Sequence, residues 1–363
     1  MRNAHAVEQP VRIAHLTHPD VTPMHTIMKP TLLISHKVIA EFSSRINDIL
    51  GAAPKPLELL PFTPDVQLTP AQMDNIEAVY YSRDIWEGTE KSALSPAAQS
   101  FWNLIDRTRN VKWIAVYSAG TDQKRYQDCM RRGMRLTTGA GAQADAVGLA
   151  CVAGVLALAR GVPYWLGAQQ RREWSPLRGK DVPRDIPGQT AVIVGMGYIG
   201  AVIARVLHAA GMKTIGVRRT VAPAAHFDQV LPPSALDGLL PACDWLVIAC
   251  PLVPETRNLI DARRLALMKP SAGIANIARG EIIDEAALAD ALKAGRLRHA
   301  YLDVFNTEPL PPESPFWDLP NVLISPHNAG ASTGTYARGV EIFLRNLEHY
   351  LQGQPLENEA SII

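Results

Sequence analysis

Three glycines with a fixed spacing directly follow a short apolar run near the middle of this chain. The run is Thr190–Val194, the glycines are Gly195, Gly197 and Gly200, and a helical pattern over Ile199–Ala210 comes next. In a strand, turn and helix of this kind, backbone N–H groups at the helix start can bind the pyrophosphate of a dinucleotide. A glycine turn with only a structural role is the alternative, and the β-α context argues against it. The sequence therefore predicts a Rossmann-type parallel sheet with a dinucleotide site.

Short apolar runs alternate with helical patterns over most of the chain, and each run predicts a buried strand. Before the glycines these runs are Thr31–Ile34, Leu57–Leu60, Ala78–Tyr81, Trp113–Tyr117 and Arg135–Thr138. After the glycines they are Lys213–Val217, Trp245–Cys250, Gly273–Ala278, His299–Phe305 and Val322–Ile324. The alternation predicts an α/β protein with doubly wound parallel sheets, and a chain of 363 residues is too long for one ordinary core.

We therefore expect two domains of similar architecture. A Rossmann coenzyme domain is predicted over residues 139–330, inserted in a flavodoxin-like substrate domain made of residues 31–138 and 331–363. Residues 1–30 are polar and rich in His and Pro, and we expect them to form an irregular arm.

A long helix is predicted over Ala142–Arg160. Small residues on most of its faces permit close packing against another helix or subunit. Gly161-Val162-Pro163 is expected to end this helix. Trp174, which follows a basic pair, is expected to have a packing role rather than a functional one.

Composition argues against several other classes of protein. A net charge of +1 provides no field to collect nucleic acid. The apolar run Ala146–Ala159 is shorter than the roughly 20 residues that cross a bilayer, and the N-terminus has no apolar signal core. The four cysteines have no paired spacing, so we expect reduced thiols and a cytoplasmic setting. We expect no metal site, because metal-ligand spacing is absent from the early histidines, His18, His25 and His36.

The end of the strand after the glycines distinguishes between cofactors. Chains that bind NAD carry Asp or Glu for the ribose hydroxyls about 20 residues beyond the glycines. Here the strand Lys213–Val217 is followed by Arg218-Arg219-Thr220, with no carboxylate. Two guanidiniums and a hydroxyl suit a 2′-phosphate, although a solvated pair of surface arginines is the alternative. The sequence predicts NADP(H) as the preferred cofactor, with NAD(H) possible.

Three polar residues that can together perform one reaction follow the last three predicted strands. They are Arg279, Glu308 and His327. In an open parallel sheet, ligands bind beyond the carboxyl ends of the strands, so we expect these side chains at one edge. Taken singly, the arginine could neutralise a helix end, the glutamate could be a solvated loop residue, and the histidine could cap a loop. Their shared placement and order after a nucleotide site favour hydride transfer to a small keto acid.

These motifs resemble the D-isomer-specific 2-hydroxyacid dehydrogenases, a family that includes glyoxylate, hydroxypyruvate, D-lactate and 3-phosphoglycerate dehydrogenases. The resemblance covers residues from about Val111 to Leu351. Its motifs occur in the family's order: Val194–Gly200, Cys250-Pro251-Leu252 with Glu255-Thr256, Asn276–Gly280, Asp303–Pro309 and Ser325–Gly330.

The resemblance implies a role for each residue of the predicted catalytic set. Arg279 would bind the substrate carboxylate and polarise the carbonyl, and His327 would exchange a proton with the carbonyl oxygen. Glu308 would bond the other imidazole nitrogen and favour its charged form. Backbone N–H groups of the loop Ser118-Ala119-Gly120 would bind the substrate carboxylate.

The resemblance also implies a set of cofactor contacts around the glycine turn. Asp303 would meet the nicotinamide side. The other positions that match cofactor contacts are Tyr198, Ile199, Cys250, Pro251, Thr256, Ile277, Arg279, His327 and Gly330. The family relationship further implies a homodimer, formed through the Ala146–Arg160 region.

The expected activity is reduction of a small 2-keto acid, or oxidation of the matching D-2-hydroxy acid, with NADP(H). The alternatives are a dinucleotide-sensing binding protein without turnover, like the corepressor relatives, and a hydrolase or lyase that uses a bound dinucleotide. The sequence leaves the particular acid and the physiological direction open. One departure is Ala146-Val147-Gly148-Leu149, where the family commonly has Ala-Val-Ala-Glu, and this leaves the hinge and interface contacts open.

Overall fold

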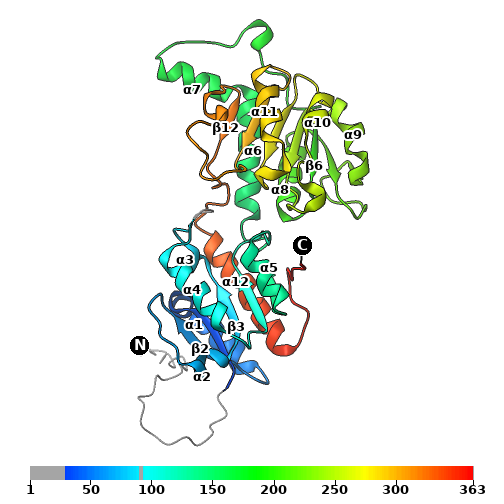
Figure 1. Ribbon diagram of the computed structural model, residues 1–363. Helices are drawn as coiled ribbons and strands as arrows, with labels where there is room; N and C mark the ends of the chain where they lie inside the picture. The colour runs from blue at the N-terminus through cyan, green and yellow to red at the C-terminus, as the bar shows by residue number, and fades with distance from the viewer. Residues whose placement is uncertain (1–28, 90–92, 363) are drawn as a thin grey trace, which may run out of the picture. The chain divides into compact units, whose positions relative to one another are not determined.

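The computed structural model describes residues 29–89 and 93–362, so most of the predicted arm, including His18 and His25, lies outside the described residues. The chain divides into two compact units, Met1–Ala142 with Tyr336–Ile362, and Gln143–Thr335, called here the first and second unit (Figure 1). The domain boundaries predicted after residues 138 and 330 lie a few residues before the boundaries of these units, which follow Ala142 and Thr335.

The first unit is built on a five-stranded parallel sheet with the order β2-β1-β3-β4-β5. This order is that of flavodoxin-like folds. The strands are β1 (Thr31–Ser35), β2 (Glu58–Phe62), β3 (Ile76–Tyr81), β4 (Trp113–Val116) and β5 (Arg135–Thr138). The helices are α1 (His36–Ala52), α2 (Pro70–Asp74), α3 (Arg83–Trp86), α4 (Pro96–Arg107), α5 (Lys124–Arg131) and α12 (Thr335–Gln352).

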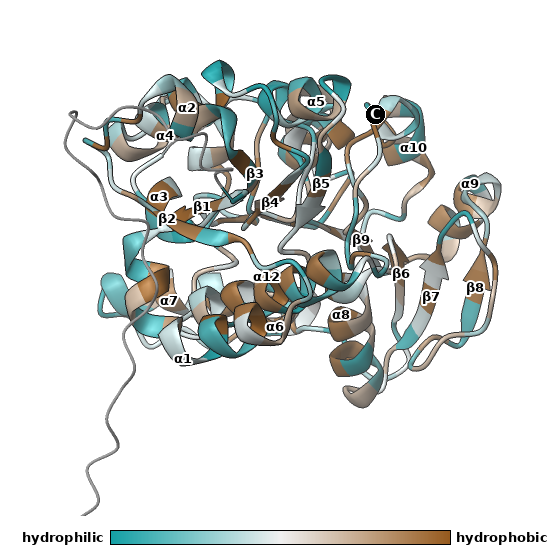
Figure 2. Ribbon diagram, turned by 90° about the horizontal axis from the view of Figure 1, so that it is seen from below, coloured by the Kyte–Doolittle hydropathy of each residue, from teal (hydrophilic) through white to brown (hydrophobic). Residues whose placement is uncertain are grey.

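Both faces of this sheet are buried, because successive side chains of a strand point to opposite faces. Leu33 and Val79 belong to one core, with residues of α4 and α5. Leu32 and Ala78 belong to the other, with residues of α1 and α12. The near-continuous apolar character of β3 and β4 is visible in Figure 2.

The second unit is built on a seven-stranded parallel sheet with the order β12-β11-β10-β9-β6-β7-β8. Read from β8, this is the Rossmann strand order extended by one strand. The strands are β6 (Thr190–Val194), β7 (Lys213–Val217), β8 (Gln229–Leu231), β9 (Trp245–Ile248), β10 (Gly273–Asn276), β11 (His299–Leu302) and β12 (Val322–Ile324). The helices are α6 (Ala144–Arg160), α7 (Val162–Gln170), α8 (Tyr198–Ala209), α9 (Leu236–Leu239), α10 (Ala262–Leu267) and α11 (Glu285–Lys293). The 3₁₀ turns are η1 (Gly179–Asp181), η2 (Pro233–Ala235), η3 (Leu240–Ala242), η4 (Pro254–Thr256), η5 (Gly280–Ile282) and η6 (Pro315–Asp318).

These two sheets confirm the predicted fold class, a Rossmann domain inserted in a flavodoxin-like one. The register also determines which loops share an edge of the second sheet. Asn276 of β10 pairs with Leu302 of β11, which pairs with Ile324 of β12. Val194 of β6 pairs with Ile248 of β9 at the point where the strand order reverses. All the loops that carry predicted cofactor and catalytic residues in this unit therefore leave from one edge.

The prediction that Gly161-Val162-Pro163 ends the long helix is confirmed, but the structure adds a second helix directly after it that the sequence analysis did not predict. Gly161 ends α6 with a left-handed φ of 76°, but α7 begins at the next residue. Pro163 lies in the first turn of α7, where a proline costs no hydrogen bond. Trp174 also differs from expectation, because it is 99% exposed.

Within the described residues, no single helix has the length and apolar character needed to cross a membrane. The pair α6 and α7 meets that test only jointly, across a bend of 72°.

Candidate active site

The glycine turn after β6 has the geometry that its sequence predicts. Gly195 has a φ of +102°, and a Cβ at this residue would lie 2.5 Å from the backbone of Ala249 in the loop after β9. A Cβ at Gly200 would lie 2.1 Å from the Gly195 carbonyl oxygen. Any larger residue at either position would push the turn, helix and strand apart. Their roles are therefore steric and local.

Gly197 differs from its two neighbours because the space around it is open. A Cβ at this residue would meet no atom within 4 Å. Gly197 is the N-cap of α8, and no side chain caps the helix there. The space next to Gly197, at the positive dipole end of α8, is therefore open, as binding of a pyrophosphate there would require. This arrangement fits the predicted dinucleotide, and Tyr198 and Ile199 form the start of the same helix.

Arg218, Arg219 and Thr220 follow β7 at the same edge. The Arg218 backbone N–H donates to the Leu231 carbonyl, and its Nη2 donates to the Ala222 carbonyl at 3.0 Å. The Nε of Arg218 is buried and has no hydrogen-bond partner among the described residues. Arg219 and Thr220 are exposed. Two guanidiniums therefore lie at this strand end, the first partly fixed by the loop.

The loop after β9 supplies the next predicted cofactor positions. Thr256 closes the loop, since its hydroxyl donates to the Pro251 carbonyl at 2.7 Å and accepts from Val253 N–H at 2.8 Å. Cys250 is 9% exposed, and burial raises the pKa of its thiol to about 11, which keeps it protonated at neutral pH. Ile277, on the neighbouring loop after β10, is 6% exposed.

Arg279 leaves the sheet on a loop held by Asn276. The Asn276 side chain, 1% exposed, donates to the Arg279 carbonyl at 2.8 Å and accepts from Ala278 N–H at 3.1 Å. The next residue, Gly280, packs so closely that a Cβ would lie 2.1 Å from the Phe305 carbonyl carbon. The Arg279 loop and the loop after β11 are therefore side by side.

Glu308 and His327 come together across the loops after β11 and β12. His327 Nδ1 lies 2.7 Å from Glu308 Oε2, and Glu308 Oε1 accepts from Phe305 N–H at 2.9 Å. The glutamate side chain is 12% exposed and the histidine 46%. The carboxylate thus orients the ring through Nδ1 and leaves Nε2 to exchange a proton, as acid–base chemistry requires.

Asp303 organises the loop that carries His327. Its carbonyl accepts from His327 N–H at 2.7 Å, and its Oδ1 accepts from the N–H groups of Asn328 and Ala329. The side chain is 3% exposed. Gly330 follows, and a Cβ there would lie 2.4 Å from Gln143 Oε1, so this part of the loop is also tightly packed.

The remaining predicted site residues, Ser118, Ala119 and Gly120, belong to the first unit and follow β4. The Ser118 hydroxyl lies 3.2 Å from the Tyr126 hydroxyl, and its carbonyl accepts from Gly139 N–H at 3.0 Å. Burial raises the pKa of Tyr126 above its usual range, so this phenol is neutral.

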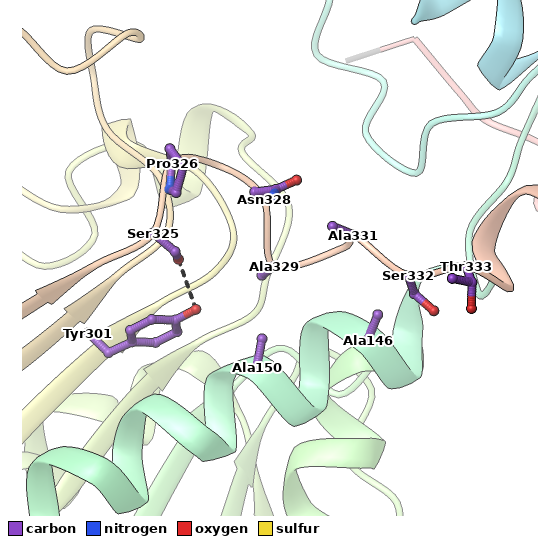
Figure 3. A pocket seen from close by; sticks show the side chains of 10 residues that line it. All are labelled: Ala146, Ala150, Tyr301, Ser325, Pro326, Asn328, Ala329, Ala331, Ser332 and Thr333. Carbon is purple, nitrogen blue, oxygen red and sulfur yellow. Dashed lines mark hydrogen bonds between the residues drawn. The ribbon is translucent and has the colours of Figure 1, made fainter. Parts of the chain in front are cut away.

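Sequence reasoning missed the residues that hold the reactive groups in place. They are Asn276, Phe305, Tyr301 and Ser325, the last two joined by a hydrogen bond of 2.9 Å (Figure 3). Asn276 gave a usable signal, because a lone amide ends an otherwise apolar run. The others act through backbone atoms or across strands, which residue type alone does not reveal.

An imidazole–carboxylate pair at the sheet edge that carries a dinucleotide turn defines the class of nicotinamide-dependent oxidoreductases. The NAD-binding domain of the D-isomer specific 2-hydroxyacid dehydrogenases matches residues 152–329 of this chain. A glyoxylate reductase from Thermofilum pendens is 34% identical over 264 residues, which cover 69% of this chain and 75% of the relative. The chain belongs to the D-isomer-specific 2-hydroxyacid dehydrogenase family.

Solved structures give the same result over nearly the whole chain. A D-isomer specific 2-hydroxyacid dehydrogenase from Xanthobacter autotrophicus, in complex with NADPH and MES, is 25% identical with a TM-score of 0.71 and covers 92% of this chain and 99% of its own. An NADPH-dependent glyoxylate/hydroxypyruvate reductase from Sinorhizobium meliloti, in complex with NADP and sulfate, is 26% identical with a TM-score of 0.69 and the same coverage. The chain is thus an NAD(P)-dependent 2-hydroxyacid dehydrogenase, and the alternative of a binding protein without turnover is not favoured.

Proposed function

We propose that this protein reduces a small 2-keto acid, such as glyoxylate or hydroxypyruvate, with NADPH, and that the second unit is its dinucleotide-binding domain. The observation that carries the proposal is the 2.7 Å contact between His327 Nδ1 and Glu308 Oε2, at the sheet edge that also carries Arg279. The names of the relatives from Thermofilum pendens and Sinorhizobium meliloti support the choice of substrate and cofactor.

Each residue has one task in this reaction. Arg279 binds the substrate carboxylate through its forked guanidinium and polarises the carbonyl. His327 donates the Nε2 proton to the carbonyl oxygen, and Glu308 holds the ring and stabilises its charged form. The hydride to the carbonyl carbon would come from a reduced dinucleotide held at the glycine turn and the start of α8. For the loop Ser118–Gly120 of the first unit, binding of a carboxylate by its backbone N–H groups stays a prediction.

Arg218, Arg219 and Thr220 are proposed to favour NADPH by binding its 2′-phosphate. We expect NADPH oxidation to exceed NADH oxidation when both are tested across ten short 2-keto acids. Arg219→Ala removes the exposed guanidinium, so it should raise the KM for NADPH about 10-fold while the KM for NADH changes less than about twofold. Steady-state kinetics with each cofactor measures both effects.

Arg296→Ala is the matched control for this substitution. Arg296 is also exposed and belongs to the same unit, but it precedes β11 and therefore lies at the amino end of the sheet. An enzyme that prefers NADH, or an Arg219→Ala variant whose NADPH kinetics match those of the control, would show that the arginines are ordinary surface charges.

We also propose a homodimer, with an interface that includes α7 and the segment after it. Most apolar residues of α6 are buried within its own unit, whereas Trp165, Leu166 and Trp174 are 44%, 52% and 99% exposed. Exposed aromatic and aliphatic side chains of this kind are typical of association surfaces.

Sedimentation velocity tests the dimer. The wild type should sediment as a dimer, and Trp165→Asp should shift it to monomer at low micromolar concentration because it places a charge in an apolar contact. Trp317→Asp is the control, since Trp317 is 51% exposed elsewhere in the same unit. A monomeric wild type, or equal effects of both changes, would count against this surface.

A further inference from the structure

His327 has a backbone conformation that its surroundings must enforce. Its φ is +49°, in the left-handed region that non-glycine residues rarely occupy. This conformation is strained for a residue that has a side chain. The direction of the imidazole depends on the backbone of His327. The contacts that fix this loop therefore also orient the ring that contacts Glu308.

Asp303 provides the direct support. Its carbonyl and carboxylate accept backbone N–H groups from three consecutive residues, His327, Asn328 and Ala329, at 2.7, 3.0 and 3.1 Å. The Ser325 hydroxyl donates to the same carboxylate oxygen at 2.6 Å. The loop therefore wraps around one buried carboxylate oxygen, and the position of that oxygen determines the position of the loop.

Tyr301 extends this chain of hydrogen bonds by one member. Its hydroxyl lies 2.9 Å from Ser325 Oγ. Because the single proton of Ser325 is directed to Asp303, Tyr301 must donate to Ser325, so the order is Tyr301 to Ser325 to Asp303. Burial raises the pKa of Tyr301 to about 12, which keeps this donor protonated.

The Tyr301 ring is itself fixed by α6. It is 4% exposed and packs onto Gly154, where a Cβ would lie 2.5 Å from the ring. A pocket of about 570 Å³ borders the same contact, lined by Tyr301, Ser325 and Ala150 among others. Figure 3 shows the phenol reaching from β11 across the space above α6 toward the serine of the His327 loop.

We propose that Tyr301 and Ser325 are positioning residues for His327. The contact with Gly154 fixes the Tyr301 ring, and the Tyr301 hydroxyl fixes Ser325 by a hydrogen bond. Ser325 in turn fixes the Asp303 carboxylate, which holds the His327 loop in its left-handed conformation and so orients the imidazole. The positioning role rests on the proposed acid–base role of His327. The hydrogen bonds do not depend on that role, so the hydrogen-bond network and the proposed function can be tested separately.

The experiment compares Tyr301→Phe with Tyr164→Phe. Tyr164 also bonds a serine, Ser175, within the same unit, and it is 41% exposed on α7. Removing one hydroxyl from Tyr301 should lower kcat about 3- to 10-fold with little change in KM or NADPH affinity. Hydrogen exchange of the Asn328 and Ala329 amides, followed by NMR, should accelerate by a similar factor. Tyr164→Phe should change neither quantity.

A pair of serine variants keeps the proposal testable if Tyr301→Phe does not fold. Ser325→Ala should lower kcat and loosen the two amides at least as much, and Ser325→Thr should recover most of both because it restores the hydroxyl. Adding Tyr301→Phe to Ser325→Ala should cause no further loss, since the phenol acts through the serine.

Several results would overturn the proposal. These are wild-type kcat and exchange in Tyr301→Phe, an equal loss in Tyr164→Phe, or a threonine variant as impaired as the alanine one. If no variant and not even the wild type reduces a keto acid, the proposed function fails, and the exchange rates alone then decide whether the network holds the loop.

Discussion

Replacing His327 with alanine is expected to lower kcat for keto-acid reduction by a factor on the order of 10³, because general acid catalysis by a positioned side chain contributes about that much. The imidazole is the one acid–base group held by a carboxylate at this edge among the described residues, with Nδ1 2.7 Å from Glu308 Oε2. NADPH should still bind, since the glycine turn and α8 are untouched. Stopped-flow turnover and fluorescence titration measure the two quantities separately.

His208→Ala is the matched control for this prediction. His208 belongs to the same unit, its side chain is 45% exposed against 46% for His327, and its Nδ1 also faces a carboxylate, Asp228 Oδ2, at 3.7 Å. If loss of an exposed imidazole near a carboxylate has no effect by itself, His208→Ala should leave kcat for keto-acid reduction unchanged. A His327→Ala enzyme with the activity of His208→Ala would exclude His327 as the proton donor.

The sheet edge that carries the site could be predicted from the sequence. Alternating apolar runs and helices imply parallel strands, and parallel strands deliver the residues that follow them to a common edge. This reasoning placed Arg279, Glu308 and His327 after three strands, which the structure pairs as neighbours in the order β10, β11, β12. The glycine turn was equally predictable, because its steric requirements are local.

Other features depend on contacts between distant residues and gave no sequence signal. The left-handed backbone of His327 follows from its pairing with Asp303, 24 positions earlier. Tyr301 reads as one more apolar residue of a strand until Gly154 of α6 is seen beneath its ring. The Gly-Val-Pro segment correctly predicts the end of α6 but gives no sign of α7, although proline is also well suited to a first helical turn.

Arg279→Lys should lower kcat/KM for glyoxylate about 10- to 100-fold, and Arg279→Ala by on the order of 10³, because charge alone does not replace a planar fork. The backbone under this side chain is rigid, since Asn276 Nδ2 bonds the Arg279 carbonyl and Gly280 packs on Phe305. A lysine on this fixed base delivers one point charge and cannot bond both carboxylate oxygens at once. Most of the loss in the alanine variant should therefore appear in kcat/KM for glyoxylate, while NADPH still binds.

The comparison of the two substitutions separates binding geometry from charge. If Arg279 supplied only a positive charge, the Arg279→Lys variant would have the kcat/KM of the wild type. Both would then exceed Arg279→Ala by the same factor. If it packed the loop without touching substrate, alanine and lysine would both weaken NADPH binding and lower the melting temperature. Addition of guanidinium to the alanine variant should recover part of the lost rate, because the free ion can occupy the space left by the side chain and bond the substrate carboxylate. An unchanged rate at saturating guanidinium, together with wild-type kinetics in Arg279→Lys, would show that Arg279 does not bind the substrate.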